Sequence, residues 1–152
     1  MAETEKVILT NMCMVYSGDK VLVQNRVKGN WTGLTFPGGH VERDESFTDA
    51  VIREVKEETG LTISCPRLCG IKQWPENDSV RYIVLFYKTD KFEGELRSSS
   101  EGEVFWMDTE DFLKGELAPD MSDMFKVFAD DDKSEFYYYK SETSDKWKYV
   151  IK

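Results

Sequence analysis

The sequence predicts a single α/β domain, residues 1–152, in which a mixed β-sheet carries helices on both faces. A length of 152 residues suits one domain, and a chain of this length can bury about two-thirds of its unfolded surface. Apolar residues make up 40% of the chain and charged residues 32%, which are the proportions of an ordinary globular protein. Strand patterns and helix patterns follow one another along the chain, which favours a sheet covered on both sides.

The first quarter of the chain predicts a β-hairpin followed by a glycine-rich loop. Residues 8–16, ILTNMCMVY, have the apolar pattern of a strand, and residues 17–19 give a turn signal. Residues 20–26, KVLVQNR, return as a second strand. Residues 27–39, VKGNWTGLTFPGG, then form a loop with a short extended piece before Pro37.

A helix follows this loop, and both of its ends are marked in the sequence. Ser46 and Asp49 have the spacing of a capping box, so the helix should begin near Phe47. Thr59 and Gly60 supply a glycine stop at the other end.

Three further segments favour strands. Residues 79–90, SVRYIVLFYKTD, form the strongest strand pattern in the chain, and residues 103–108, EVFWMD, form a shorter one. In the charged and aromatic tail, residues 135–139, EFYYY, favour an edge strand.

Two shorter helices complete the expected elements. Residues 109–115, TEDFLKG, predict a helical turn that is capped at its first residue and stops at its glycine. Residues 122–130, SDMFKVFAD, predict a final helix with Met124, Phe125 and Phe128 facing inward.

The charge and the apolar pattern exclude several classes of partner. A net charge of −9 repels long nucleic acids, which usually need a basic stripe, although a cation could bridge an anionic small molecule to the protein. No segment approaches the roughly 18 apolar residues of a membrane span, and the first residues lack a basic-then-apolar signal pattern. We therefore expect a cytoplasmic protein with a small-molecule partner and no membrane association.

The cysteines argue against a zinc site. The sequence contains Cys13, Cys65 and Cys69 but one histidine, and the Cys65–Cys69 spacing alone is a weak metal signal. We interpret all three as reduced thiols in or near the core.

The predicted first helix places acidic groups on its apolar side. At about 100° per residue from Phe47, Val51 and Val55 lie within about 80° and define the apolar stripe. Glu58 falls at about 20° and Glu54 at about 340°, so both lie inside or beside this stripe.

A solvated acidic face is the ordinary interpretation of such a charge run, but three features oppose it. The glutamates lie on the side that should be buried, while Lys56 faces away. Glu54 and Glu58 form a like-charge i,i+4 pair, and acidic groups near a helix C-terminus oppose the helix dipole. A divalent cation would compensate these costs, because Mg²⁺ binds hard oxygen ligands and Glu57 adds a third carboxylate.

The same residues resemble the signature of the Nudix hydrolases. That signature is a glycine, five residues, a glutamate, seven residues, and then Arg-Glu-aliphatic-x-Glu-Glu-x-Gly-aliphatic. Residues 39–61 fill every fixed position, with Gly39, Glu45 and the run REVKEETGL at residues 53–61. The preceding FPGG is also typical of the family.

The resemblance implies an α/β/α sandwich with a mixed sheet and a metal site of Mg²⁺, with Mn²⁺ as a possible substitute. The metal ligands that it implies are the Gly38 carbonyl and the carboxylates of Glu54, Glu57 and Glu58. The resemblance also gives Arg53 the role of orienting the first helix glutamate, and it gives Glu45 a supporting role.

The identity of the catalytic base stays open at this point. Hydrolysis needs a carboxylate that takes a proton from the attacking water or positions it. Glu57 on the helix is one candidate, and Glu101 or Glu103 in the segment SSSEGEVFW is the other. Each of the latter two could equally be a carboxylate at the rim.

For the substrate, the chain looks most like the MutT-type members that hydrolyse 8-oxo-dGTP to 8-oxo-dGMP and pyrophosphate. Arg26, Phe36, Gly39 and Asp120 are the candidate substrate-binding residues; Asp120 could instead cap the last helix. Hydrolysis of ADP-ribose or another nucleoside diphosphate derivative is an alternative. Some ADP-ribose hydrolases carry a proline after the signature, and Pro75 lies near that position. A nucleotide-binding module without activity is a further alternative, and homodimers are common in the family.

Overall fold

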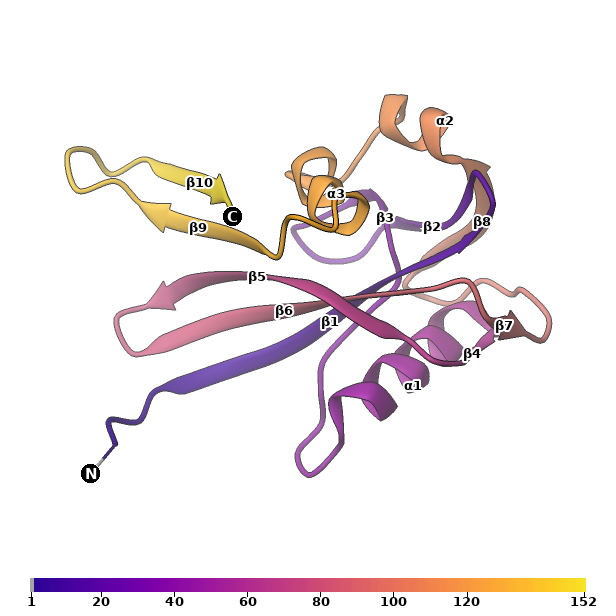
Figure 1. Ribbon diagram of the computed structural model, residues 1–152, viewed down its shortest axis with the longest axis horizontal. Coiled ribbons are helices and arrows are strands. Elements are labelled where there is room, and N and C mark those ends of the chain that lie inside the picture. Colours follow the sequence, from indigo (N-terminus) through magenta and orange to yellow (C-terminus); the bar gives the residue numbers. More distant parts are fainter. Residues whose placement is uncertain (1) are drawn as a thin grey trace.

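A long, twisted β-sheet forms the centre of the molecule, and helices lie against both of its faces (Figure 1). The computed structural model describes residues 2–152. The strands are β1 (Lys6–Ser17), β2 (Lys20–Arg26), β3 (Gly33–Thr35), β4 (Thr62–Ile63), β5 (Arg67–Asn77), β6 (Val80–Thr89), β7 (Phe92–Glu93), β8 (Gly102–Asp108), β9 (Glu135–Lys140) and β10 (Trp147–Ile151). The helices are α1 (Phe47–Thr59), α2 (Thr109–Lys114) and α3 (Met121–Ala129). None of these helices is long and apolar enough to cross a membrane.

The sheet is mixed, as the sequence predicts. Its strand order is β10-β9-β5-β6-β1-β2-β3, with β8 also paired to β2, while β4 and β7 form a separate small pair. β1 runs parallel to β6, and β5 runs parallel to β9, whereas the other pairs are antiparallel. The predicted hairpin is confirmed, but β1 and β2 pair only beside their turn. The rest of that edge of β1 is therefore available to another segment.

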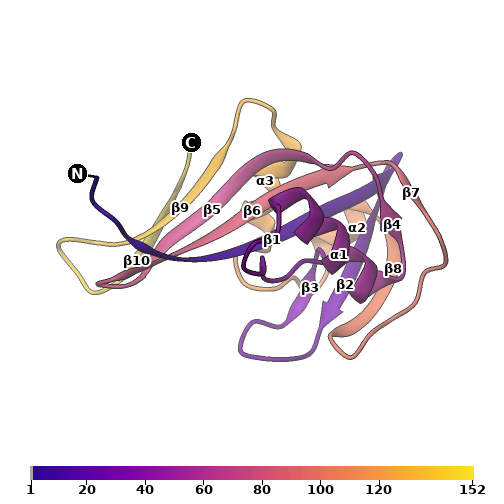
Figure 2. The ribbon, with the colours of Figure 1, turned by 90° about the horizontal axis from the view of Figure 1, so that it is seen from below.

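Alternation along β1 divides the core into two layers. Met12 and Met14 belong to the cluster on the side of α2 and α3, whereas Cys13 and Val15 belong to the cluster on the side of α1. This is the two-residue period of a strand that is buried on both faces. Figure 2 shows α1 lying across β1 and β6 on the near side of the sheet.

The predicted ends of α1 are confirmed. The Ser46 hydroxyl accepts the Asp49 amide at 3.0 Å, and Gly60 takes a left-handed conformation with φ of 80°. Val51 and Val55 are fully buried, but the assignment of Phe47 to the buried stripe is wrong, because its side chain is 43% exposed. The first turn of α1 extends beyond the sheet surface that buries the later turns.

Two details of the predicted helices are also corrected. Asp108, and not Thr109, occupies the N-cap position of α2, and its side chain makes no capping bond. The Thr109 hydroxyl instead donates to the Asp19 carbonyl at 2.8 Å. In α3, Met124 and Phe128 are buried as predicted, whereas Phe125 is only partly buried.

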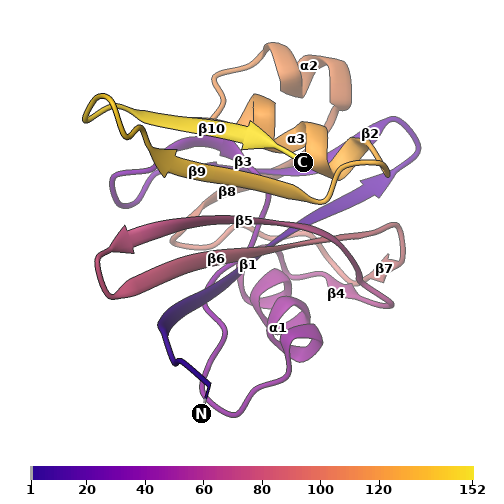
Figure 3. The same cartoon turned by 60° about the vertical axis from the view of Figure 1, so that its left-hand side comes forward.

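The C-terminal residues form a hairpin that extends the sheet (Figure 3). The strand predicted at residues 135–139 is confirmed as β9, but its predicted place at the sheet edge is wrong, because β9 lies between β5 and β10. The hairpin is held by aromatic stacking, with the rings of Tyr138 and Trp147 5.2 Å apart. One of the three free cysteines also departs from expectation, since Cys65 is exposed rather than near the core.

The C-terminal stop of α1 gives a stability prediction. A side chain at Gly60 would overlap the Glu95 carbonyl and would also be strained by the positive φ. At Gly18, where φ is 58°, a side chain would meet no other atom. Gly18→Ala should therefore be destabilised only by the positive φ, without a clash. We expect Gly18→Ala to lower the free energy of unfolding by about 1 kcal/mol and Gly60→Ala to lower it by more than twice as much. Urea titrations measure both values, and equal losses of unfolding free energy in the two variants would contradict a clash at Gly60.

Candidate active site

The loop before α1 is attached to the free edge of β1. The Cys13 amide donates to the Pro37 carbonyl, and the Asn11 amide donates to the Gly39 carbonyl, both at 2.8 Å. The Gly39 amide in turn donates a hydrogen bond to Asn11 Oδ1 at 3.1 Å. The loop therefore continues the sheet for a few residues, and β1 fixes its position relative to α1.

Gly38 faces the opposite way, towards α1. Its amide donates to Glu58 Oε2 at 3.0 Å. In an extended segment the N–H and C=O of one residue point to the same side, so the Gly38 carbonyl also faces the helix. A side chain at Gly38 would overlap the Asn11 carbonyl, which explains the glycine.

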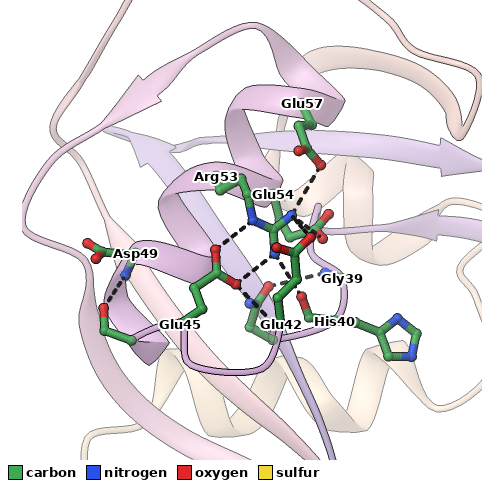
Figure 4. A network of polar contacts seen from close by, with 10 residues as sticks. Gly39, His40, Glu42, Glu45, Asp49, Arg53, Glu54 and Glu57 are labelled. Atoms are coloured by element: carbon green, nitrogen blue, oxygen red, sulfur yellow. Dashed lines mark hydrogen bonds and ion pairs between the residues drawn. The ribbon is translucent and has the colours of Figure 1, made fainter.

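Arg53 connects the loop to the acidic face of α1 (Figure 4). Its guanidinium donates to Glu45 at 2.7 and 2.9 Å, to Glu54 at 2.9 Å and to Glu57 at 3.3 Å. It also donates to the His40 carbonyl at 3.0 Å. The hydrogen bonds from Arg53 lower the pKa of Glu45 to about 2, and in return Glu45 raises the pKa of Arg53.

Two of the helix carboxylates are withdrawn from water. Glu58 is 5% exposed and accepts hydrogen bonds from Gly38 and from Gln24 Nε2, the latter at 3.2 Å. Burial raises the pKa of Glu58 to about 7, and it also raises the pKa of Glu54. A side chain at Gly39 would overlap the Glu54 carboxylate, so this glycine leaves space for it.

The donor set fits a hard divalent cation. Glu58 contacts only neutral donors, and Glu54 has one guanidinium partner, so the buried negative charge is incompletely compensated. Glu57 is largely exposed and can turn without a packing cost. Within residues 2–152, no three acidic, histidine or cysteine side chains already converge as a cluster. The fit therefore rests on the oxygen chemistry of the donors and on the incompletely compensated charge of Glu54 and Glu58.

A cavity of about 750 Å³ extends from this loop across the sheet. All four residues predicted to bind substrate line it: Arg26, Phe36, Gly39 and Asp120. Phe36 is only 2% exposed, and its ring packs against Phe112 and Phe128, so it forms part of the cavity floor. Gly38, Gly39 and His40 of the loop and Asp120 at the start of α3 therefore line one cavity.

Asp120 occupies the N-cap position of α3, but its side chain makes no capping bond. Its backbone carbonyl accepts the Met124 amide at 2.9 Å, while its carboxylate lies 3.8 Å from Lys72 Nζ. The carboxylate is therefore directed to the cavity rather than to the helix end.

Glu101 and Glu103 are separated by the structure. β8 begins at Gly102, so Glu101 lies in the turn before the strand, whereas Glu103 lies on the strand. Glu101 lies 3.7 Å from Arg26 at the cavity, and its charge contributes to the raised pKa of Glu58. Glu103 is exposed and pairs with Asn25.

Comparison with known proteins decides the family. The NUDIX domain model matches residues 8–128. The chain belongs to the Nudix hydrolase family. An uncharacterized Nudix hydrolase of Bacillus subtilis, YvcI, is 32% identical over 112 residues, which are 70% of each protein. An ADP-ribose pyrophosphatase of Methanocaldococcus jannaschii is 31% identical over 90 residues, which are 58% of this chain and 53% of that protein. The crystal structure of the mutator MutT protein from Bacillus halodurans has a TM-score of 0.77 at 27% identity, covering 95% of this chain and 97% of that one.

The Nudix fold also brings to the site residues that the sequence analysis missed. Gln24 contacts Glu58, Asn11 holds Gly39, and Lys72 faces Asp120. Strand alternation could have identified Gln24, because it lies two residues after the buried Leu22 and on the same face. Asn11 Nδ2 is the buried side-chain polar atom without a partner among residues 2–152. No sequence pattern marks Lys72, since its partners come from distant segments.

The geometry predicts unequal effects for the two acidic residues near β8. We expect Glu101→Ala to lower kcat by about 10² or more, because Glu101 pairs with Arg26, which lines the cavity, and a carboxylate there can take part in proton transfer. Glu103→Ala, the matched control, should stay within about twofold of the parent. Steady-state kinetics under Mg²⁺ saturation make the comparison, and a near-neutral Glu101→Ala would place the base on α1.

Proposed function

We propose that this Nudix hydrolase is an Mg²⁺-dependent pyrophosphohydrolase that converts 8-oxo-dGTP into 8-oxo-dGMP and pyrophosphate, with Mn²⁺ able to replace Mg²⁺. This proposal rests chiefly on one observation: a single cavity is lined by Gly38 and Gly39 of the signature loop and by Asp120. The likeness to the Bacillus halodurans MutT structure over nearly the whole chain supports this choice.

At the signature end, the residues that would hold the cation are Glu54, Glu57 and Glu58, together with the Gly38 carbonyl. The raised pKa values of Glu54 and Glu58 and the direction of the Gly38 carbonyl support this assignment. When bound, the cation would neutralise phosphate charge and make the attacking water more acidic.

The protein's own groups supply positioning and proton transfer. The water oxygen forms a bond to phosphorus, the phosphoanhydride P–O bond breaks, and pyrophosphate leaves with the bonding electrons. The proton lost by the water goes to a carboxylate, for which Glu101 is favoured by its contact with the cavity residue Arg26 and Glu57 is the second candidate. Arg26 lines the same cavity and can contact a phosphate oxygen.

At the other end, Asp120 is the candidate base reader. A guanine edge offers the donors N1–H and N2–H₂, and a carboxylate can accept both. The absence of a capping bond from the Asp120 side chain supports this role over that of a helix cap.

Hydrolysis of ADP-ribose is the second candidate, since the Methanocaldococcus jannaschii relative carries that activity in its name. The proline noted as a possible marker of this subgroup, Pro75, lies where the register between β5 and β6 shifts. A register shift is a structural reason for a proline in a strand, so Pro75 does not favour this substrate. Release of the nucleoside monophosphate from 8-oxo-dGTP, dGTP and ADP-ribose decides between the two candidates.

The metal assignment predicts large losses for conservative substitutions on α1. Glu57→Gln and Glu58→Gln should each lower kcat by on the order of 10³ or more, because several kcal/mol of transition-state stabilisation depend on the cation. Both variants should remain folded by circular dichroism, since removing like charge from α1 does not disturb packing. Glu110→Gln, at an exposed position on α2, is the control. Activity that persists after exhaustive chelation would contradict the assignment.

The base-reading role of Asp120 predicts a change in substrate preference. Asp120→Ala should lower kcat/KM for guanine nucleotides more than for pyrimidine nucleotides, because the donors of the guanine edge lose their acceptor. The difference should correspond to roughly 1–3 kcal/mol of transition-state binding. A helix cap would instead lower thermal stability by about 1 kcal/mol and leave the ratios unchanged. Unchanged ratios would remove the base-reading role and leave the hydrolase assignment intact.

A further inference from the structure

The base end of the cavity contains a buried lysine. Lys72 lies on β5, is 8% exposed and lines the cavity together with Asp120. Its neighbours in the sheet are Val84 on β6 and Phe136 on β9. Its side chain therefore enters the cavity from the sheet, opposite the start of α3 that carries Asp120.

Aromatic rings surround the ammonium group. Lys72 Nζ lies 5.3 Å from the ring centre of Trp74, 5.1 Å from that of Phe136 and 5.8 Å from that of Tyr138. Rings at these distances attract a cation through their negative faces. Phe136 and Tyr138 belong to the β9–β10 hairpin, which lies beside β5 (Figure 3) and outside the residues matched by the family model.

The hydrogen-bonding capacity of this ammonium is largely unused. One hydrogen bond goes to Met124 Sδ, a weak acceptor, at 3.6 Å, and Asp120 Oδ2 lies 3.8 Å away, beyond an N–H···O hydrogen-bond distance. An ammonium carries three donors, and a buried donor without an acceptor is costly. Burial accordingly lowers the pKa of Lys72, although Asp120 opposes this effect. A ligand acceptor in the cavity would relieve the cost.

We propose that Lys72 is a specificity-determining residue that donates to the ring carbonyl of a 6-oxopurine while Asp120 accepts from the adjacent ring N–H. A donor and an acceptor 3.8 Å apart match the neighbouring O6 and N1–H of guanine or hypoxanthine. This inference rests on the proposed function, because it assigns the base edge that the same cavity reads.

The pair also explains how other bases would be rejected. In the same pose, adenine places an amino donor against the Lys72 ammonium and the unprotonated N1 against the Asp120 carboxylate. Cytosine likewise lacks a carbonyl next to a ring N–H. Unpaired polar groups in a buried site discriminate strongly against the wrong ligand. The edge is the same in guanine and in 8-oxoguanine, so Lys72 should serve dGTP and 8-oxo-dGTP alike.

The experiment compares Lys72→Met with the parent in the full-length protein. Methionine keeps an unbranched side chain and removes the charge. Lys88→Met is the matched control, because Lys88 is also largely buried on the neighbouring strand but bonds the Phe128 carbonyl and Asp131 outside the cavity. Values of kcat/KM are measured for dGTP, 8-oxo-dGTP, dITP, dATP and dCTP with Mg²⁺, and calorimetry gives the affinities for GMP and AMP.

We expect Lys72→Met to lower kcat/KM at least about tenfold for dGTP, 8-oxo-dGTP and dITP, and less than about threefold for dATP and dCTP. The preference for GMP over AMP should fall by a similar factor, whereas Lys88→Met should preserve every ratio. The proposal is overturned if Lys72→Met lowers all substrates equally along with the melting temperature, since that indicates a structural lysine. It is also overturned if only 8-oxo-dGTP is affected, or if the parent shows no preference for 6-oxopurines.

The calorimetric arm separates this proposal from the proposed hydrolase function. If the parent hydrolyses none of the triphosphates but prefers GMP to AMP through Lys72, the base-reading role stands and the substrate assignment fails. If hydrolysis is robust but the GMP preference does not depend on Lys72, the hydrolase stands and this proposal fails.

Discussion

The arrangement of the active site depends on the Arg53 guanidinium. Arg53 is the cation that holds Glu45 of the loop, Glu54 and Glu57 of α1 and the His40 carbonyl in one network. A planar group with five donors can satisfy several carboxylate oxygens at once, which a lysine at this position could not do. Without it, the acidic face would carry repelling charges near a helix end whose dipole already opposes them.

A second constraint is the burial of Glu58, whose carboxylate lies against Gln24 of β2 and Gly38 of the loop. The neutral donors Gln24 and Gly38 orient its carboxylate but do not cancel its charge, and the raised pKa expresses the remaining cost. The chain therefore gives up some stability at this position. Such a sacrifice is characteristic of functional sites, where local rules of stability are broken for a compensating purpose.

The parts of the structure that could be predicted from sequence are those determined by nearby residues. The ends of α1 follow from Ser46 and Gly60, and the signature loop follows from close-approach glycines. β5 escaped prediction because Pro75 and several polar residues interrupt its pattern, and β10 because aromatic stacking across the hairpin, rather than alternation, holds it. The pairing of Lys72 with Asp120 could not be foreseen either, since it joins residues 48 positions apart through tertiary packing alone.

Under the proposed function, the cavity has a phosphate end, which a local motif determines, and a base end, which tertiary packing determines. The phosphate end is lined by the signature loop, which Arg53 connects to α1, so its geometry belongs to a local motif that a whole family can share. The base end combines β5, the start of α3 and the C-terminal hairpin, so a change in any one segment alters its lining without moving the carboxylates on α1. Substrate preference can therefore diverge among Nudix hydrolases while the hydrolytic end stays constant, and the base end is where the specificity of this protein must be sought.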